Sequence, residues 1–266
     1  YGDQQLQFHQ QLRGGVGQGF HSRELLSQRS VSPMSNSLPL SDNTLLDAVD
    51  RSESSVRITE IFYSLQGEAR TVGLPTVFVR LTGCPLRCLY CDTEYAFSGG
   101  ELFSIDSIAS QVAAFSPRYV TVTGGEPLAQ KTCLPLLTAL CDAGYEVSLE
   151  TSGAMSMAGV DERVVKVLDL KTPASGEMAR NDYGNVPLLA PRDQVKFVIC
   201  DREDYDWARF KLDEYRLAEK VSDVLFSPSH GQLSGRELAE WILADNLPVR
   251  LQLQLHKLLW NDAPGH

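Results

Sequence analysis

The stretch Thr76-Val77-Phe78-Val79-Arg80-Leu81-Thr82-Gly83-Cys84 runs from an apolar, β-branched segment into a cysteine, and Cys88 and Cys91 follow it closely. The β-branched segment predicts a strand, and the turn residues after it predict a loop that carries all three cysteines. Three thiols in one loop directly after a strand indicate a site at that end of a sheet.

Further polar motifs end other predicted strands. Gly124-Gly125-Glu126, Thr151-Ser152-Gly153 and Ser227-Pro228-Ser229-His230 each follow a short apolar run. Because alternating strands and helices favour a parallel sheet, whose functional groups gather at the carboxyl ends of the strands, we expect these motifs to meet at one site.

The whole pattern predicts an α/β fold. We expect strands at 58–63, 76–81, 119–123, 146–150, 164–170, 195–199, 224–227 and 250–254, with helices at 105–115, 133–143, 203–219 and 235–244. A closed eightfold barrel typically takes about 250 residues. The segment from Arg57 onward is shorter and has few helices after Gly153, which favours a shortened or partly open (β/α) barrel.

Composition divides the chain and excludes some classes of partner. Residues 1–56 are rich in Gln and Ser without a sustained period, which predicts a mostly disordered extension before a catalytic domain at 57–266. The net charge of −10 argues against a nucleic-acid partner. No apolar run approaches the roughly 18 to 20 residues of a membrane span, so we expect a cytoplasmic protein without a membrane partner.

The cysteine triplet has the chemistry of a metal site. Three soft thiolates suit zinc or an iron-sulfur cluster. A closed structural zinc site needs a fourth ligand, but Cys133, Cys141 and Cys200 lie where cysteine usually packs as a small hydrophobe. A cubane with three protein ligands leaves one iron open. A zinc-binding interaction module that recruits His230 or Cys133 is the alternative from another class.

The spacing Cys84-x3-Cys88-x2-Cys91, followed one strand later by Gly124-Gly125-Glu126-Pro127, resembles the radical S-adenosylmethionine superfamily. Five further segments are similar to the 7-carboxy-7-deazaguanine synthase family within it. They are Glu60-Ile61-Phe62-Tyr63-Ser64-Leu65-Gln66-Gly67-Glu68, Cys91-Asp92-Thr93, Glu150-Thr151-Ser152-Gly153, Asp169-Leu170-Lys171-Thr172-Pro173 and Gln254-Leu255-His256-Lys257-Leu258. Another radical enzyme, such as a glycyl-radical activase, would share the triplet but not the loop at Leu65 to Glu68 or Thr93.

The resemblance implies roles for individual residues. The cluster ligands would be Cys84, Cys88 and Cys91, and Thr93 would hold Mg²⁺. The substrate would contact Leu65, Gln66, Gly67, Glu68, Arg80 and Thr123. S-adenosylmethionine would contact Tyr90, Asp92, Gly125, Glu126, Ser152, Lys171, Ser227, Pro228, Ser229 and His230. A threonine in this position is otherwise typical of a turn or a helix cap, and a single histidine is more often structural.

The chemistry of some of these side chains agrees with those roles. A guanidinium such as Arg80 binds a carboxylate through two parallel hydrogen bonds, and Gln66 and Glu68 offer donor and acceptor edges for an aminopyrimidinone ring. A carboxylate such as Glu126 can accept hydrogen bonds from an ammonium.

The resemblance also implies a reaction and its partners. An external electron donor such as a flavodoxin or ferredoxin would reduce a [4Fe-4S] cluster, and S-adenosylmethionine would yield a 5′-deoxyadenosyl radical. That radical would take hydrogen from 6-carboxy-5,6,7,8-tetrahydropterin, whose ring contracts with loss of ammonia, a step toward queuosine. The family further implies a homodimer.

Overall fold

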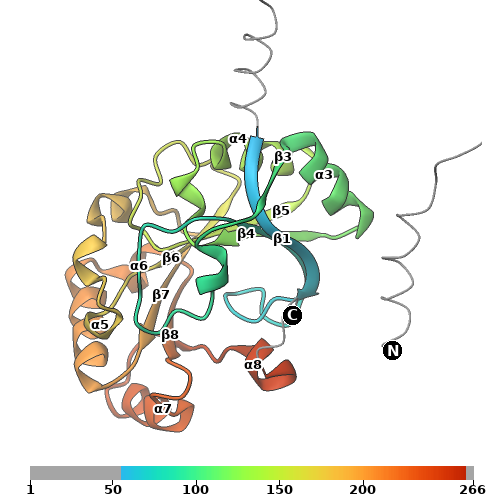
Figure 1. The fold of residues 1–266 in the computed structure, drawn as a ribbon. Coiled ribbons are helices and arrows are strands. Elements are labelled where there is room, and N and C mark those ends of the chain that lie inside the picture. The colour runs from blue at the N-terminus through green and yellow to red at the C-terminus, as the bar shows by residue number, and fades with distance from the viewer. Residues whose placement is uncertain (1–54, 262–266) are drawn as a thin grey trace, which may run out of the picture. The chain divides into compact units, whose positions relative to one another are not determined.

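One open sheet carries the part of the chain that the structure, a computed structural model, describes, residues 55–261 (Figure 1). Within that range the strands lie in the order β3-β1-β2-β4-β5-β6-β7-β8-β9. Their bounds are Ser55–Leu65 (β1), Pro75–Leu81 (β2), Glu101–Ser104 (β3), Tyr119–Gly124 (β4), Glu146–Thr151 (β5), Val165–Asp169 (β6), Gln194–Ile199 (β7), Asp223–Pro228 (β8) and Arg250–Leu251 (β9).

The strand directions confirm the partly open barrel. β1 is antiparallel to β2 and β3, whereas each neighbouring pair from β2 to β9 is parallel. The edge strands β3 and β9 do not pair with each other, so the sheet curves without closing. The carboxyl ends of the parallel strands therefore share one rim, as the motifs predict.

Helices follow several of the strands (Figure 1), and three of them begin at a residue whose side chain caps the helix. Their bounds are Ile105–Ala114 (α3), Cys133–Asp142 (α4), Arg202–Glu214 (α5), Leu217–Lys220 (α6), Gly235–Ala244 (α7) and Leu255–Trp260 (α8). Short 3-10 helices cover Glu94–Ala96, Pro127–Ala129, Pro173–Ser175, Met178–Arg180 and Tyr183–Leu188. The side chains of Ser104, Asp201 and Ser234 each accept the backbone N–H of the third residue of α3, α5 and α7, respectively, the expected use of Ser and Asp at an N-cap.

The side chains of the strands alternate between a buried apolar face and a polar face that lines the cavity. In β2, Val77 and Val79 are fully buried in the core cluster that the sheet forms with α3, α4, α5 and α7. Phe78 and Arg80 point the other way and line a cavity. This period of two, typical of strands, places a row of polar side chains on the face away from the helices.

The structure differs from the sequence expectations in a few elements. β3 was not predicted, because its four residues bury no side chain completely and give no apolar alternation. The predicted helix 203–219 is two helices, α5 and α6, because Arg216 between them adopts the left-handed conformation at φ 51°. α8 was also not predicted, and β9 covers only two residues of the expected strand.

At the chain ends, Ser55 and Val56 belong to β1, and the rest of the predicted extension, residues 1–54, lies outside the described residues. None of the helices in 55–261 is both long enough and apolar enough to cross a membrane.

Candidate functional site

A cavity of about 680 Å³ lies at the carboxyl ends of the parallel strands. Most of the residues that the sequence singles out line it: Leu65, Gln66, Gly67, Glu68, Arg80, Cys84, Cys88, Tyr90, Cys91, Asp92, Thr93, Thr123, Gly125, Ser152, Lys171, Ser229 and His230. The expectation that several strand ends meet at one site is thereby confirmed.

The cysteine loop forms one wall of the cavity. Cys84, Cys88 and Cys91 are half-buried free thiols, and the Arg87 guanidinium fixes the loop by donating to the carbonyl oxygens of Cys84 (2.8 Å) and Leu86 (2.6 Å). Burial raises the pKa of the Cys88 thiol to about 11 and also raises the pKa values of Cys84 and Cys91. The thiols must therefore lose their protons when they bind a metal.

The donor set fits a cluster with three protein ligands. Within 55–261, no three His, Cys, Asp or Glu side chains are already arranged around a common point as a metal site. Of the two fourth ligands that a zinc module would recruit, Cys133 is fully buried in α4 and does not line the cavity, whereas His230 does line it. Three soft thiols beside an open cavity suit an iron-sulfur cluster with one free iron position.

Gly125 brings the end of β4 against the cysteine loop. A Cβ atom at this position would lie 2.4 Å from the carbonyl oxygen of Gly83 and 2.5 Å from Cβ of Cys84. The N–H of Glu126 donates to the same Gly83 oxygen at 2.9 Å. A glycine is required here because the two backbone segments touch.

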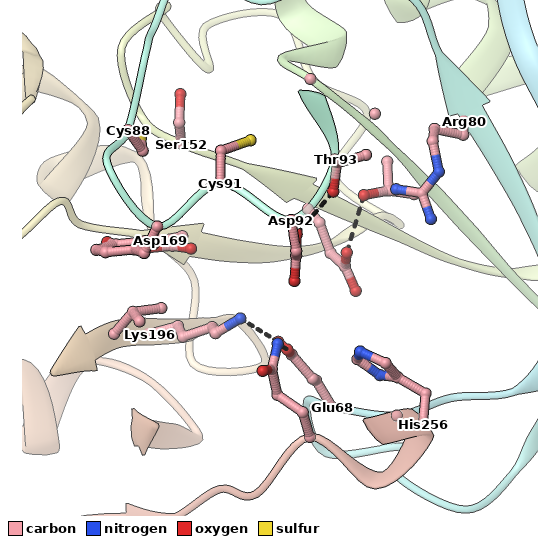
Figure 2. Close-up of a pocket in the computed structure, with 18 of the residues that line it drawn as sticks. Glu68, Arg80, Cys88, Cys91, Asp92, Thr93, Ser152, Asp169, Lys196 and His256 are labelled. Atoms are coloured by element: carbon pink, nitrogen blue, oxygen red, sulfur yellow. Dashed lines mark hydrogen bonds and ion pairs between the residues drawn. The ribbon is translucent and has the colours of Figure 1, made fainter. Parts of the chain in front are cut away.

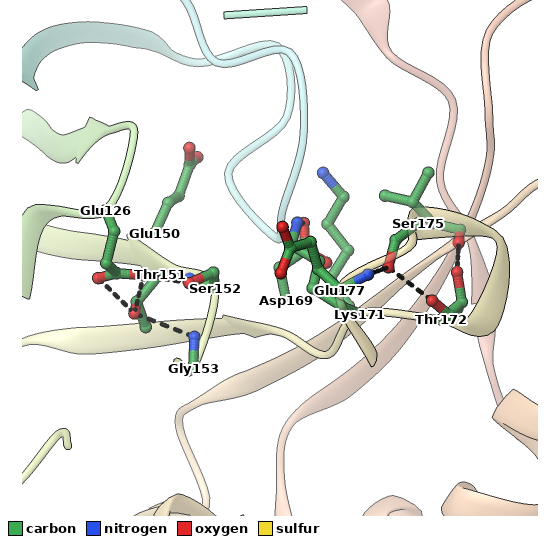
Figure 3. Close-up of polar contacts among 12 residues, drawn as sticks. Glu126, Glu150, Thr151, Ser152, Gly153, Asp169, Lys171, Thr172, Ser175 and Glu177 are labelled. Carbon is green, nitrogen blue, oxygen red and sulfur yellow. Dashed lines mark hydrogen bonds and ion pairs between the residues drawn. The ribbon is translucent and has the colours of Figure 1, made fainter. Parts of the chain in front are cut away.

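Glu126 does not line the cavity, and its carboxyl group lies against Thr151 and Ser152 (Figure 3). This fully buried group accepts the N–H of Leu128 at 3.0 Å, the Thr151 hydroxyl at 2.9 Å and the N–H of Ser152 at 2.7 Å, and it also accepts the Ser152 hydroxyl. Glu126 thus binds the end of β5 and positions Ser152, which lines the cavity. Its expected contact with S-adenosylmethionine stays a prediction.

Arg80 lies in the wall opposite the cysteine loop with one edge already engaged. Its Nε atom is 2.6 Å from Oε1 of Glu60, which also accepts the Tyr95 hydroxyl at 2.8 Å. The guanidinium carbon lies 5.7 Å from the centre of the Phe62 ring and 5.9 Å from that of Tyr95. Glu60 and the rings fix the guanidinium, and its terminal nitrogens remain suited to bind an anionic group in the cavity.

A buried charge network forms the floor. Lys196 pairs with Glu68, whose other oxygen accepts from Gln254 at 2.7 Å (Figure 2). Burial alone would lower the pKa of Lys196, but Glu68 and Asp169 raise it. Lys196 therefore stays charged.

Glu150 adds a second carboxyl group to the floor. It accepts the Thr123 hydroxyl at 2.9 Å and the Gln66 side-chain amide at 3.3 Å. Burial and the nearby Glu68 raise the pKa of Glu150. Burial thus disfavours the charged form of this carboxyl group, which lines the cavity.

Two polar atoms near the cysteine loop lack partners among residues 55–261. The Tyr90 hydroxyl and Oδ1 of Asp169 are buried without a hydrogen bond, although both residues line the cavity. The other Asp169 oxygen lies 3.1 Å from Nζ of Lys171. Buried polar groups are nearly always satisfied, so these atoms indicate where a polar ligand binds.

Comparisons with known proteins agree with this geometry. A family profile described as Radical SAM superfamily matches residues 78–216. The chain is 45% identical to the 7-carboxy-7-deazaguanine synthase of Koribacter versatilis over 219 residues, which cover 77% of this chain and 97% of that protein. It is 46% identical to the enzyme of the same name from Chlorobaculum tepidum, with 80% and 98% covered. The chain belongs to the 7-carboxy-7-deazaguanine synthase family.

The fold of this family is also seen in a solved structure. The crystal structure of QueE from Escherichia coli matches with a TM-score of 0.60 at 21% identity and covers 79% of this chain and 98% of that one. Membership in the Radical SAM superfamily implies a [4Fe-4S] cluster and S-adenosylmethionine. The three thiols and the orphaned atoms of Tyr90 and Asp169 fit these groups.

Three residues expected to contact S-adenosylmethionine in this 7-carboxy-7-deazaguanine synthase family member do not line the cavity: Glu126, Ser227 and Pro228. Ser227 is buried within β8 at 1% exposure, and Pro228 ends that strand. The two residues after them, Ser229 and His230, do line the cavity.

Other cavity residues were missed as site residues from the sequence: Glu60, Tyr95, Glu150, Asp169, Lys196, Gln254 and Lys257. A signal for some of them existed. Arg80 and Thr123 pair across β2 and β4, and Glu150, Asp169 and Lys196 occupy the same polar face of the next strands. A polar residue at the carboxyl end of an otherwise apolar strand identifies Asp169, the last residue of β6, whereas Lys196 lies in the middle of β7.

Proposed function

We propose that the chain converts 6-carboxy-5,6,7,8-tetrahydropterin to 7-carboxy-7-deazaguanine with loss of ammonia. The observation that carries this proposal is one cavity that has the cysteine loop on one side, Arg80 opposite, and Gln66 and Glu68 at the floor. The cysteine loop suits a radical-generating cofactor. Arg80 and the floor offer a guanidinium and hydrogen-bonding edges, which suit a pterin that bears a carboxylate.

Cys84, Cys88 and Cys91 would hold the [4Fe-4S] cluster, and Tyr90, Ser152 and Lys171 would contact S-adenosylmethionine. When bound there, these groups supply one-electron chemistry that abstracts a hydrogen atom from the substrate. The protein would orient these groups. Gly125 and Ser152 line the cavity beside the cysteine loop, and the Glu126 carboxyl group positions Ser152.

The side chains opposite the cysteine loop and at the floor of the cavity would fix the pterin. Arg80 would bind its carboxylate, held in place by Glu60. Gln66 and Thr123 would bind the ring edges, and Glu150, which accepts from both of them, would fix their orientation. Enclosure by these side chains excludes water from the reacting atoms.

We further propose that Mg²⁺ binds at Thr93. Its hydroxyl lines the cavity and donates to Oδ1 of Asp92 at 2.8 Å, which leaves the lone pairs of the hydroxyl oxygen for a cation. Hard oxygen donors and few protein ligands are typical of magnesium sites. The cation would neutralise the substrate carboxylate during the rearrangement.

The proposal includes an external electron donor such as a flavodoxin or ferredoxin, a cytoplasmic location and a homodimer. The family resemblance supports these three points.

An anaerobic assay tests the proposed function. The reconstituted chain is mixed with a reductant, S-adenosylmethionine, Mg²⁺ and the pterin, and mass spectrometry detects 7-carboxy-7-deazaguanine. We expect product from the wild type, none from Cys88→Ala, and a KM for the pterin raised about tenfold in Arg80→Lys, because lysine loses the planar two-point contact. Formation of 5′-deoxyadenosine without this product would show that the substrate is a different one.

A further inference from the structure

Residues 252–260, here called the C-terminal strap, lie against the loop after β1. The Gln254 side chain donates to Glu68 at 2.7 Å, and the N–H of Leu255 donates to the carbonyl oxygen of Gly67 at 2.9 Å. A Cβ atom on Gly67 would lie 2.4 Å from Nδ1 of His256. The strap is therefore seated on this loop with no spare room.

The same strap reaches the cysteine loop on its other side. Nζ of Lys257 lies 3.2 Å from Oδ2 of Asp92, and the Lys257 side chain is only 9% exposed. Asp92 directly follows the cluster cysteine Cys91 (Figure 2). One short segment thus contacts both the substrate loop and the cluster loop.

Asp92 uses its two oxygens for two different partners. Oδ2 faces Lys257, whereas Oδ1 accepts the Thr93 hydroxyl at 2.8 Å. These two contacts orient the carboxylate, so the hydroxyl hydrogen of Thr93 points at it.

We propose that Lys257 is a positioning residue: it holds the Asp92 carboxylate in the orientation that takes the hydroxyl hydrogen of Thr93 and leaves the Thr93 oxygen open to a divalent cation. This inference rests on the proposed function, because the cation site belongs to it. A carboxylate without the ammonium has more than one orientation, and a Thr93 hydroxyl without a fixed acceptor has more than one rotamer. The strap thereby prepares the cation site from outside the cluster loop.

Binding of Mn²⁺ to the cluster-loaded chain, read from the loss of the free-ion electron paramagnetic resonance signal, tests the role without turnover. S-adenosylmethionine and the pterin are present, and no reductant is added. We expect Lys257→Met to weaken Mn²⁺ binding about tenfold, which corresponds to about 1.4 kcal/mol. Lys257→Arg retains the charge and should stay within about threefold of the wild type. Lys131→Met, at an exposed lysine outside the cavity, is the matched control and should change nothing.

A role in stability alone predicts another result. Lys257→Met would then lower the melting temperature but bind Mn²⁺ as the wild type does, and the proposal would be overturned. Lys257→Gln, with a shorter polar side chain, serves if the Met variant does not fold. In an Asp92→Asn background, Lys257→Gln should cause little further loss, because the partner that Lys257 orients is already neutral; a full second loss would contradict the proposal.

Product formation by the wild type separates the two proposals. A wild type that forms product while Lys257→Met binds Mn²⁺ normally overturns only the positioning role. A wild type that binds Mn²⁺ and loses affinity in Lys257→Met, but forms no 7-carboxy-7-deazaguanine, overturns only the substrate.

Discussion

The carboxyl group of Glu126 accepts both the backbone N–H and the side-chain hydroxyl of Ser152, although the two residues follow different strands. With the N–H of Leu128 and the Thr151 hydroxyl, four donors converge on one buried group. Glu126 thus connects the end of β4 to the end of β5, while the preceding residue, Gly125, contacts the cysteine loop.

Replacing this acceptor tests its role. Glu126→Gln puts an NH₂ group among donors, so at least one buried donor loses its partner. We expect a loss of about 2 kcal/mol in the free energy of unfolding, measured by urea denaturation of the metal-free chain. Glu162→Gln, at an exposed site, is the control and should change stability little. Equal stability of the two variants would show that the donors find other partners.

Lys196→Met should destabilise the chain in a pH-dependent way. It leaves Glu68, Glu150 and Asp169 without their shared cation, and breaking a buried pair typically costs about 3 to 5 kcal/mol. Burial already raises the pKa of Glu150, and the variant lacks the lysine that lowers it. Protonation of Glu150 stabilises the fold of the variant at low pH, and this stability is lost as pH rises through the raised pKa.

Melting temperatures of wild type and Lys196→Met, measured from pH 5 to 8, check this sign. The deficit of the variant should be largest at the alkaline end of that range. The double variant Lys196→Met/Glu68→Gln should recover part of it, since one of the uncompensated charges is gone. A deficit independent of pH would point to lost packing of the lysine stem instead.

The Cys88 thiol of the metal-free chain should react slowly with alkylating agents. Burial raises its pKa to about 11 against 9.0 for a free thiol, so the thiolate fraction at pH 8 is lower by about 100-fold. Iodoacetamide labelling followed by peptide mass spectrometry measures this rate, with free cysteine as the reference. The rate should keep rising up to about pH 11, and a plateau near pH 9 would contradict the buried thiol.

Gly125→Ala should reduce cluster loading. The new methyl group would contact Gly83 and Cys84, so the cysteine loop must move. We expect less iron per chain after anaerobic reconstitution. Gly144→Ala is the matched control, because its φ of 88° causes similar or greater backbone strain but the methyl group would meet nothing within 4 Å. Full iron content in Gly125→Ala would show that the loop tolerates the shift.

Much of the fold was predictable, because its signals are local. Apolar runs with β-branched residues located the eight predicted strands, and the polar residues that end them located the site. β3 carried no such signal, since it is held by backbone pairing with β1 and by Gly100, which fits only because it lacks a side chain next to Thr82 and Ile58.

Which way a side chain points was harder to predict than which strand it belongs to. Glu126 belongs to a motif associated with cofactor binding, yet its partners Thr151 and Ser152 lie one strand further on and hold its carboxyl group in the interior. Lys196 looks like an ordinary strand residue until the sheet places it beside Glu68. Such pairings depend on tertiary structure, which no local pattern reports.

The contact between Glu68 and Gln254 joins residues 186 positions apart in the chain. Closing so large a loop costs more entropy than pairing neighbouring strands, and contacts between distant residues tend to form slowly. The sheet and the cysteine loop would therefore be in place before the strap arrives. Such an order of folding would leave the thiols accessible to iron and sulfide from the strap's side until residues 252–260 dock.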